Sequence, residues 1–133
     1  APGVRFVYSD IGFILLGMLV EQVTGSTLDR YDAENVFEPL DMKSTRYLPP
    51  SGWRRRTAPT AINPWRQRHL RGEVHDENAA RLGGVSGHAG LFSTGRDLST
   101  FARMYLNHGA VGPRRVLDSA TVAAIARLQD STI

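Results

Sequence analysis

The tripeptide Tyr8-Ser9-Asp10 stands directly before a long apolar segment of this sequence. Because that segment has helical periodicity, we expect the phenol of Tyr8 to lie at a helix N-terminus, where partial positive charge favours the phenolate. Tyr8 is therefore a candidate general base, with Asp10 as a candidate catalytic carboxylate and Ser9 as a candidate cleft residue. The alternative is that Tyr8 is a packing residue whose hydroxyl is satisfied by a neighbour, as tyrosines before helices commonly are.

A second group of polar residues lies further along the chain, where His69 precedes His75-Asp76-Glu77-Asn78 and His88 follows. Their spacing matches no H-E-x-x-H or related zinc pattern, so we predict no metal site, and we expect no cofactor. The stretch His75-Asp76-Glu77-Asn78 is instead expected to make loop hydrogen bonds or to line a substrate cleft, with His75 and Asn78 as the candidate cleft residues. For His88, in a glycine-rich turn, we expect a structural hydrogen bond; a catalytic role is the lesser alternative.

Four helices are predicted around these residues. Residues 9–24 form an amphipathic to largely buried helix, with Ser9 or Asp10 at its start and Gly25 as a left-handed C-terminal cap. Gly17 in its middle should let another element approach closely. The second helix runs from about residue 27 to 37, the third begins at 94 or 95 and ends by 109, and the last begins at 118 or 119. The apolar repeats are Phe13, Leu16, Val20 and Val23 in the first helix, Leu98, Phe101, Met104 and Tyr105 in the third, and Val122, Ile125 and Leu128 in the last.

Residues 41–80 lack any sustained periodicity and are interrupted by Pro49-Pro50, Ser51-Gly52, Pro59 and Asn63-Pro64. An irregular stretch of this length is uncommon inside a compact domain. We therefore interpret it as a functional loop or a family-specific insertion, which contributes one wall of a cleft.

The composition is that of a globular chain, with 41% hydrophobic and 22% charged residues among 133. The absence of cysteine excludes disulfides and thiolate metal sites. The longest apolar run, residues 11–20, is too short to span a membrane. The net charge of +3 comes almost wholly from arginine, concentrated at residues 54–56, 66, 68 and 71 beside two tryptophans. With no nucleic-acid-binding motif beside them, we interpret these arginines as a solvated connection that pairs with carboxylates, not as a nucleic-acid surface.

Three blocks of the sequence resemble the class C β-lactamase and penicillin-binding-protein family of serine hydrolases. Residues 8–17, YSDIGFILLG, are similar to the family's Y-S-N-x-G-Y-x-L-L-G signature. Residues 36–45, VFEPLDMKST, resemble its I-F-x-P-L-G-M-x-x-T segment, and residues 83–98, GGVSGHAGLFSTGRDL, resemble its A-G-G-L-x-S-T-A-x-D-L segment. The blocks follow the family's order and together span most of the chain.

The resemblance implies an α/β fold in which a mostly helical domain flanks an antiparallel sheet, with the site between them. This chain matches chiefly the helical part, so we predict a mostly α structure: a partial β-lactamase-like domain over residues 1–133 with a long irregular segment. In the family a serine and a lysine come from an upstream S-x-x-K, and a K-T-G or H-x-G strand comes later; neither occurs here. The remainder of the fold must then supply the nucleophile serine and its lysine, and we expect this segment alone to be inactive.

By the same resemblance Tyr8 takes the place of the family's site tyrosine, and Asp10 that of its asparagine. An asparagine amide donates and accepts hydrogen bonds, whereas an ionised aspartate only accepts. This difference argues against efficient β-lactam turnover and leaves esterase, amidase or D-Ala peptidase chemistry on a small-molecule or peptide acyl substrate. The alternative is a non-catalytic relative that uses the same cleft to bind a peptide or a partner. A periplasmic or extracellular location would fit the family.

Overall fold

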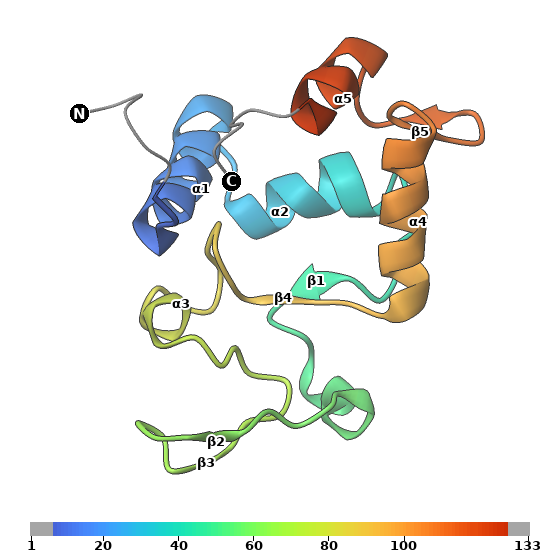
Figure 1. Cartoon of the computed structure of the whole chain (residues 1–133). Coiled ribbons are helices and arrows are strands. Elements are labelled where there is room, and N and C mark those ends of the chain that lie inside the picture. Colours follow the sequence, from blue (N-terminus) through green and yellow to red (C-terminus); the bar gives the residue numbers. More distant parts are fainter. Residues whose placement is uncertain (1–6, 128–133) are drawn as a thin grey trace.

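The computed structural model describes residues 7–127, and helices dominate it (Figure 1). α1 (Asp10–Thr24) is followed by α2 (Leu28–Asp32), which continues through a π-helical turn (Ala33–Phe37). α3 (Glu77–Arg81) is a short helix, and α4 (Gly95–Leu106) and α5 (Ser119–Ala126) follow it in the chain. α2 lies between α1 on one side and α4 on the other. The chain is therefore mostly α, as the sequence predicts for this part of the fold.

In residues 7–127 the strands form three antiparallel pairs, and each strand is two residues long. β1 (Arg46–Tyr47) pairs with β4 (Leu91–Phe92), which joins the start of the irregular segment to the end of the glycine-rich turn. β2 (Ile62–Asn63) pairs with β3 (Arg68–His69), and β5 (Ala110–Val111) pairs with β6 (Arg114–Arg115). A 3₁₀ helix (Ser51–Arg56) lies between β1 and β2. Residues 41–80 thus hold short turns and one hairpin in place of long regular elements.

α1 ends as the sequence predicts, because Gly25 adopts the left-handed conformation with φ of 68° and its N–H donates to the carbonyl of Glu21. The predicted close approach at Gly17 is also confirmed, since a Cβ there would lie 3.0 Å from the backbone nitrogen of Gly87. Ser9 is the N-cap residue, but its side chain makes no capping hydrogen bond.

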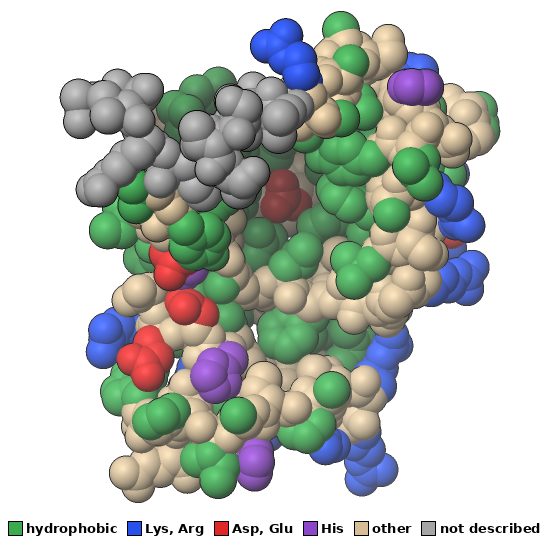
Figure 2. Space-filling model, viewed as in Figure 1, with side chains coloured by type: hydrophobic (Ala, Val, Ile, Leu, Met, Phe, Trp, Pro, Cys, Tyr) green, Lys and Arg blue, Asp and Glu red, His purple; other side chains and the backbone are tan. Residues whose placement is uncertain are grey.

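The expectation that α1 is largely buried is wrong. Gly17 is its buried residue, whereas Ile11 is 68% exposed and Val23 is 76% exposed. Within the described residues α1 packs through its Gly17 face, and its apolar side chains elsewhere stay at the surface. Figure 2 shows hydrophobic side chains gathered on the face over α1, α2 and α4, around a hollow in its middle. Exposed hydrophobic patches of this kind mark interaction surfaces or ligand-binding grooves.

The core lies between the π-helical turn and α4. Buried Phe37, Leu40 and Met42 pack with Met104, which is only 1% exposed. The aromatic rings of Phe101 and Tyr105 meet edge to face, 5.3 Å apart, beside this cluster. Leu128, which the sequence places on the apolar face of the last helix, lies outside the described residues.

A buried carboxylate joins α4 to the start of the irregular segment. Asp97, 6% exposed, accepts hydrogen bonds from the backbone N–H of Ser44 at 2.8 Å and the hydroxyl of Thr45 at 2.9 Å. The N–H of Asp97 donates in turn to Thr94, the side-chain cap of α4. Two of the sequence blocks that resemble the hydrolase family therefore meet at this carboxylate.

The arginines of the irregular segment are paired largely within that segment. Glu73 accepts from Arg54 at 3.1 Å and from Arg68 at 2.7 Å, which holds the pKa of Glu73 below its usual range. Arg56 stacks on the ring of Trp53, and Arg66 and Arg81 lie over the ring of Trp65. These contacts agree with a connection whose arginines find carboxylate and aromatic partners.

Within residues 7–127 no single helix is long and apolar enough to cross a membrane. α1 and the helical stretch Leu28–Phe37 meet that test only as a pair, on length and composition alone, and the two are bent by 78°.

Candidate active site

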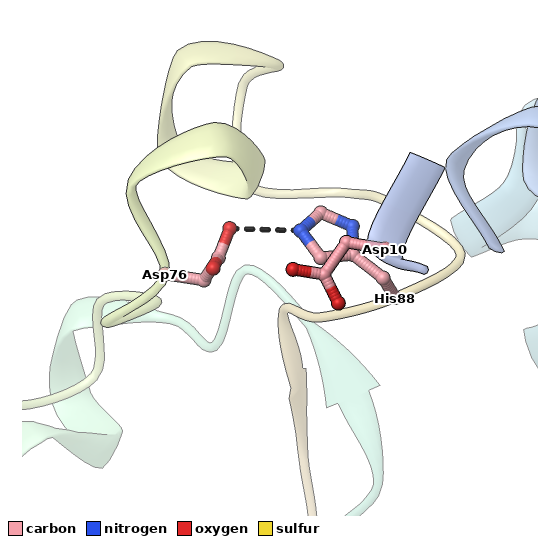
Figure 3. Close-up of side chains that lie close together, drawn as sticks. All are labelled: Asp10, Asp76 and His88. Carbon is pink, nitrogen blue, oxygen red and sulfur yellow. Dashed lines mark hydrogen bonds and ion pairs between the residues drawn. The ribbon is translucent and has the colours of Figure 1, made fainter. Parts of the chain in front are cut away.

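Asp10, Asp76 and His88 come together from three separate parts of the chain (Figure 3). Their carboxylate oxygens and ring nitrogen all lie within 4.8 Å of one another. His88 Nε2 is 2.8 Å from Asp76 Oδ1, and His88 Nδ1 is 2.8 Å from the hydroxyl of Ser86. The side chain of His88 is 3% exposed and that of Asp76 is 34% exposed. A buried imidazole thus has both nitrogens hydrogen-bonded and two carboxylates beside it.

Local structure explains why each member sits where it does. Asp10 begins α1, where the helix dipole favours a carboxylate. Asp76 is the N-cap of α3, and its Oδ1 accepts from the N–H of Ala79 at 2.7 Å. That backbone donor, with the nearby His88 adding to its effect, lowers the pKa of Asp76. Gly87, next to His88, lies so close to α1 that a Cβ there would overlap the carbonyl oxygen of Phe13.

The order serine, histidine, aspartate in this network resembles the contacts of a catalytic triad. Ser86, however, is only 6% exposed, and its own backbone carbonyl faces the hydroxyl of Tyr47. A nucleophile has to reach the acyl carbon of a substrate, whereas Ser86 is largely buried and its hydroxyl is hydrogen-bonded to His88 Nδ1. Ser86 therefore orients the ring of His88 and is not the attacking group.

Asp10, Asp76 and His88 are also the set within residues 7–127 whose atoms could share a metal ion. Nε2 of His88 is already hydrogen-bonded to Asp76. Hydrogen bonds account for the positions of Asp76 and His88, and the carboxylate of Asp10 lies within 4.8 Å of both. The members come from α1, α3 and the glycine-rich turn, whereas His69, which the sequence places near His75-Asp76-Glu77, bonds to the carbonyl of Thr60.

Tyr8 lies at the open side of this region. Its side chain is 72% exposed, just before α1, and its ring centroid is 6.4 Å from that of Phe13. Ser9 is extended and exposed, and its carbonyl accepts from Gly12 at 3.2 Å. Both residues face space that a neighbouring element or a substrate can occupy.

The other predicted cleft residues have different surroundings. His75 and Asn78 are exposed, and the hydrogen bonds observed at these positions involve their backbone carbonyls. His88 has the structural hydrogen bonds that its turn suggests, with a carboxylate as one partner. Asp76 belongs to the stretch expected to make loop hydrogen bonds or line the cleft, but the sequence did not mark it as a site residue. Its place one residue before a short helical stretch marks it as an N-cap, but nothing in the sequence pairs it with His88.

A second ionisable pair, Tyr47 and Asp32, lies behind this network. The hydroxyl of Tyr47 is 3.5 Å from Asp32 Oδ2 and 3.5 Å from the carbonyl of Ser86. Burial, reinforced by the negative charge of Asp32, raises the pKa of Tyr47 to about 12. Burial also raises the pKa of Asp32. Asp32 belongs to the lining of an apolar cavity of about 260 Å³, whose other lining residues are Val36, Phe37, Met42, Thr45, Leu91, Leu98 and Phe101.

Comparison with known proteins places the chain in a family. The model of the beta-lactamase family matches residues 1–130. A protein of Escherichia coli K12 named as a D-alanyl-D-alanine carboxypeptidase is 38% identical over 135 residues, which cover 91% of this chain and 31% of that protein. The chain thus spans about a third of the length of such relatives.

Solved structures share the fold. A penicillin-binding protein from Bacillus halodurans has a TM-score of 0.64 and 25% identity, over 92% of this chain and 34% of that one. A D-stereospecific amidohydrolase from Streptomyces has a TM-score of 0.66 and 23% identity, over 95% of this chain and 34% of that one. With the family model matching nearly its whole length, this chain belongs to the beta-lactamase family.

Proposed function

We propose that this chain is the Tyr8- and Asp10-bearing part of a serine acyl hydrolase that works through an acyl-enzyme. The observation that carries the proposal is the start of α1, where exposed Tyr8 stands two residues before Asp10 and Asp10 faces a fixed imidazole. Family membership supports the same assignment, because Tyr8 and Asp10 occupy the positions of the Y-x-N motif. The serine and lysine come from parts of the fold outside this sequence, which has no S-x-x-K.

The chemistry follows from these groups. The serine oxygen bonds to the carbonyl carbon of the substrate, while its proton passes to the lysine amine, with the phenol oxygen of Tyr8 relaying it. The C–N or C–O bond to the leaving group then breaks, and the same proton moves to the leaving nitrogen or oxygen. Water attacks the acyl-enzyme in the second half, giving a carboxylic acid and the free serine. Tyr8 fits this shuttle because its hydroxyl is exposed at the positive end of α1.

The substrate we propose is a small peptide, ester or amide with a D-amino acid at the bond that is cleaved. Supporting this choice are the relative named as a D-alanyl-D-alanine carboxypeptidase, and structural neighbours named D-stereospecific amidohydrolase and D-amino acid amidase. Asp10 favours substrates that donate a hydrogen bond to it, because a carboxylate has no proton to offer a carbonyl. Efficient β-lactam turnover is therefore not expected.

The test is to treat the longer protein that carries this segment with a fluorophosphonate or penicillin probe and to measure its intact mass. We expect an adduct on the longer protein and none on residues 1–133 alone. An adduct on residues 1–133 would place the nucleophile within this sequence and contradict the proposal. If neither species is labelled, the fold serves as a binding module for a peptide or partner.

Tyr8→Phe in the longer protein isolates the role of the phenol. We expect acylation to slow by about a hundredfold or more, because proton transfer by a positioned group contributes on that scale. The exposed ring still packs beside Phe13 in this variant, so thermal unfolding should not change. Acylation at the normal rate would remove Tyr8 from the mechanism.

A further inference from the structure

We infer that His88 is a positioning residue for the site, and that the Asp76–His88 pair fixes where the carboxylate of Asp10 lies beside Tyr8. This inference rests on the proposed function, in which Asp10 stands at the Y-x-N position. It assigns a role to two residues outside the Y-x-N, S-x-x-K and K-T-G motifs of the family.

The first argument is that the ring of His88 has one orientation. Its side chain is 3% exposed, its Nε2 meets Asp76 and its Nδ1 meets Ser86, each at 2.8 Å. Turning the ring would break both hydrogen bonds inside the protein, where water does not replace them. The serine hydroxyl can donate or accept, so the network holds whether His88 is neutral or charged.

The second argument is that this ring is fixed relative to α1 itself. Gly87 lies against the backbone of α1 at Phe13 and Gly17, within two turns of Asp10. Asp76 is held by the N–H of Ala79 at the start of α3. The glycine-rich turn, α3 and the first turn of α1 thus form one contact region, with the imidazole at its centre (Figure 3).

The third argument is electrostatic. The carboxylates of Asp10 and Asp76 lie within 4.8 Å of each other and of the ring nitrogen. Two carboxylates at that separation repel, and an imidazole that is hydrogen-bonded to one of them and lies beside the other offsets part of the repulsion. Without the ring, the carboxylate of Asp10 would move away from that of Asp76, and this displaces the acceptor that the site offers to its lysine or its substrate.

A double-mutant cycle on kcat tests the inference in the longer protein, with a D-alanyl ester as substrate. We expect His88→Gln to lower kcat by about tenfold, with KM changed by less than about twofold, because positioning acts on the transition state. In an Asp10→Asn background the same substitution should lower kcat by less than about twofold, because the carboxylate that His88 positions is gone. The control is His108→Gln, which changes an exposed histidine at the end of α4 and should leave kcat unchanged.

Equal losses of kcat in both backgrounds would overturn the inference, because His88 would then act independently of Asp10.

A second cycle covers the case that His88→Gln unfolds the protein. It combines Asp76→Asn with Asp10→Asn, and the asparagine keeps a side-chain oxygen to cap α3. The matched control for Asp76→Asn is Asp118→Asn, the same change at the N-cap of α5. If acyl-enzyme forms and depends on Tyr8 but the cycle is additive, this inference fails alone. If no acyl-enzyme forms at all, both this inference and the proposed function fail.

Discussion

Two aspartates near helix starts, Asp97 and Asp76, have opposite surroundings in this molecule. Asp97 is 6% exposed and accepts from neutral donors, the N–H of Ser44 and the hydroxyl of Thr45. Asp76 is partly open, pairs with a histidine and has a second carboxylate, Asp10, close by. The first arrangement satisfies one charge with neutral donors, whereas the second sets like charges beside each other.

This difference separates a structural role from a functional one. A buried charge with sufficient donors stabilises the chain segments that it joins, here α4 and residues 44–45. Like charges beside each other cost stability, and proteins keep them mostly where chemistry needs them. The Asp97 region should therefore control folding, and the Asp10–Asp76–His88 region should control activity.

The largest effect on stability should come from Asp97→Ala. We expect the free energy of unfolding to fall by about 3 kcal/mol, because the N–H of Ser44 and the hydroxyl of Thr45 lose their acceptor inside the protein. Urea denaturation measures the change. Asp10→Ala, the matched change in the other region, should alter stability by less than about 1 kcal/mol, because it relieves repulsion while losing a dipole contact. Comparable losses at the two sites would contradict the division of roles.

A smaller effect should appear in the dependence of stability on pH. The backbone N–H of Ala79, helped by His88, lowers the pKa of Asp76 below its ordinary value of 3.8. A lowered pKa in the folded state adds stability above pH 3.8, and that stability is lost as the pH falls through the lowered value. Urea denaturation between about pH 6 and 2 should therefore show a steeper acid loss in the native chain than in Asp76→Asn.

Asp118 provides the comparison that sharpens this test. It caps α5 with the side chain and backbone of Thr121 as donors, which lower the pKa of Asp118, and it has no histidine at the carboxylate in the described structure. Asp118→Asn therefore measures how much an aspartate N-cap without a histidine partner contributes to the acid dependence of stability. If Asp76→Asn and Asp118→Asn reduce the acid loss of stability equally, His88 does not contribute to lowering the pKa of Asp76.

The fold was predictable where local signals are strong. The start and end of α1, the close approach at Gly17 and the start of α4 follow from glycine, apolar periodicity and helix-capping residues. The exposure of α1 was not predictable in the same way. Its apolar residues predict burial, and the described part of the molecule holds too little to bury them. Periodicity gives the apolar face of a helix but not the element that covers it.

The site was predictable in part. Residue types and family motifs single out Tyr8 and Asp10 as catalytic candidates and His88 as a turn residue with a structural hydrogen bond, and the structure brings Asp10 and His88 together. The partner Asp76 was not predictable, because the contact joins the N-cap of α3 to a turn twelve positions away through an irregular segment. No period relates such positions, so only the folded backbone brings them together. For the same reason His75 and Asn78 are not part of the cluster, although they are neighbours of Asp76 in sequence.

The smallest expected effect concerns Tyr47, which touches both regions. It lies in β1 two residues after Thr45, and its hydroxyl is 3.5 Å from the carbonyl of Ser86. Because burial and Asp32 raise its pKa to about 12, an absorbance titration should show a late ionisation step that belongs to Tyr47. Its neutral form stabilises the fold fully below pH 10, and that contribution is lost as the pH rises through about 12.

Tyr47→Phe isolates this link between the two regions. The late ionisation step should disappear, and stability at neutral pH should fall by less than about 1 kcal/mol because both hydrogen bonds are long. If all tyrosines of the native chain instead ionise together near pH 10, the hydroxyl of Tyr47 meets solvent. β1 would then not hold the glycine-rich turn behind His88, and the two regions would be coupled only through the paired backbones of β1 and β4.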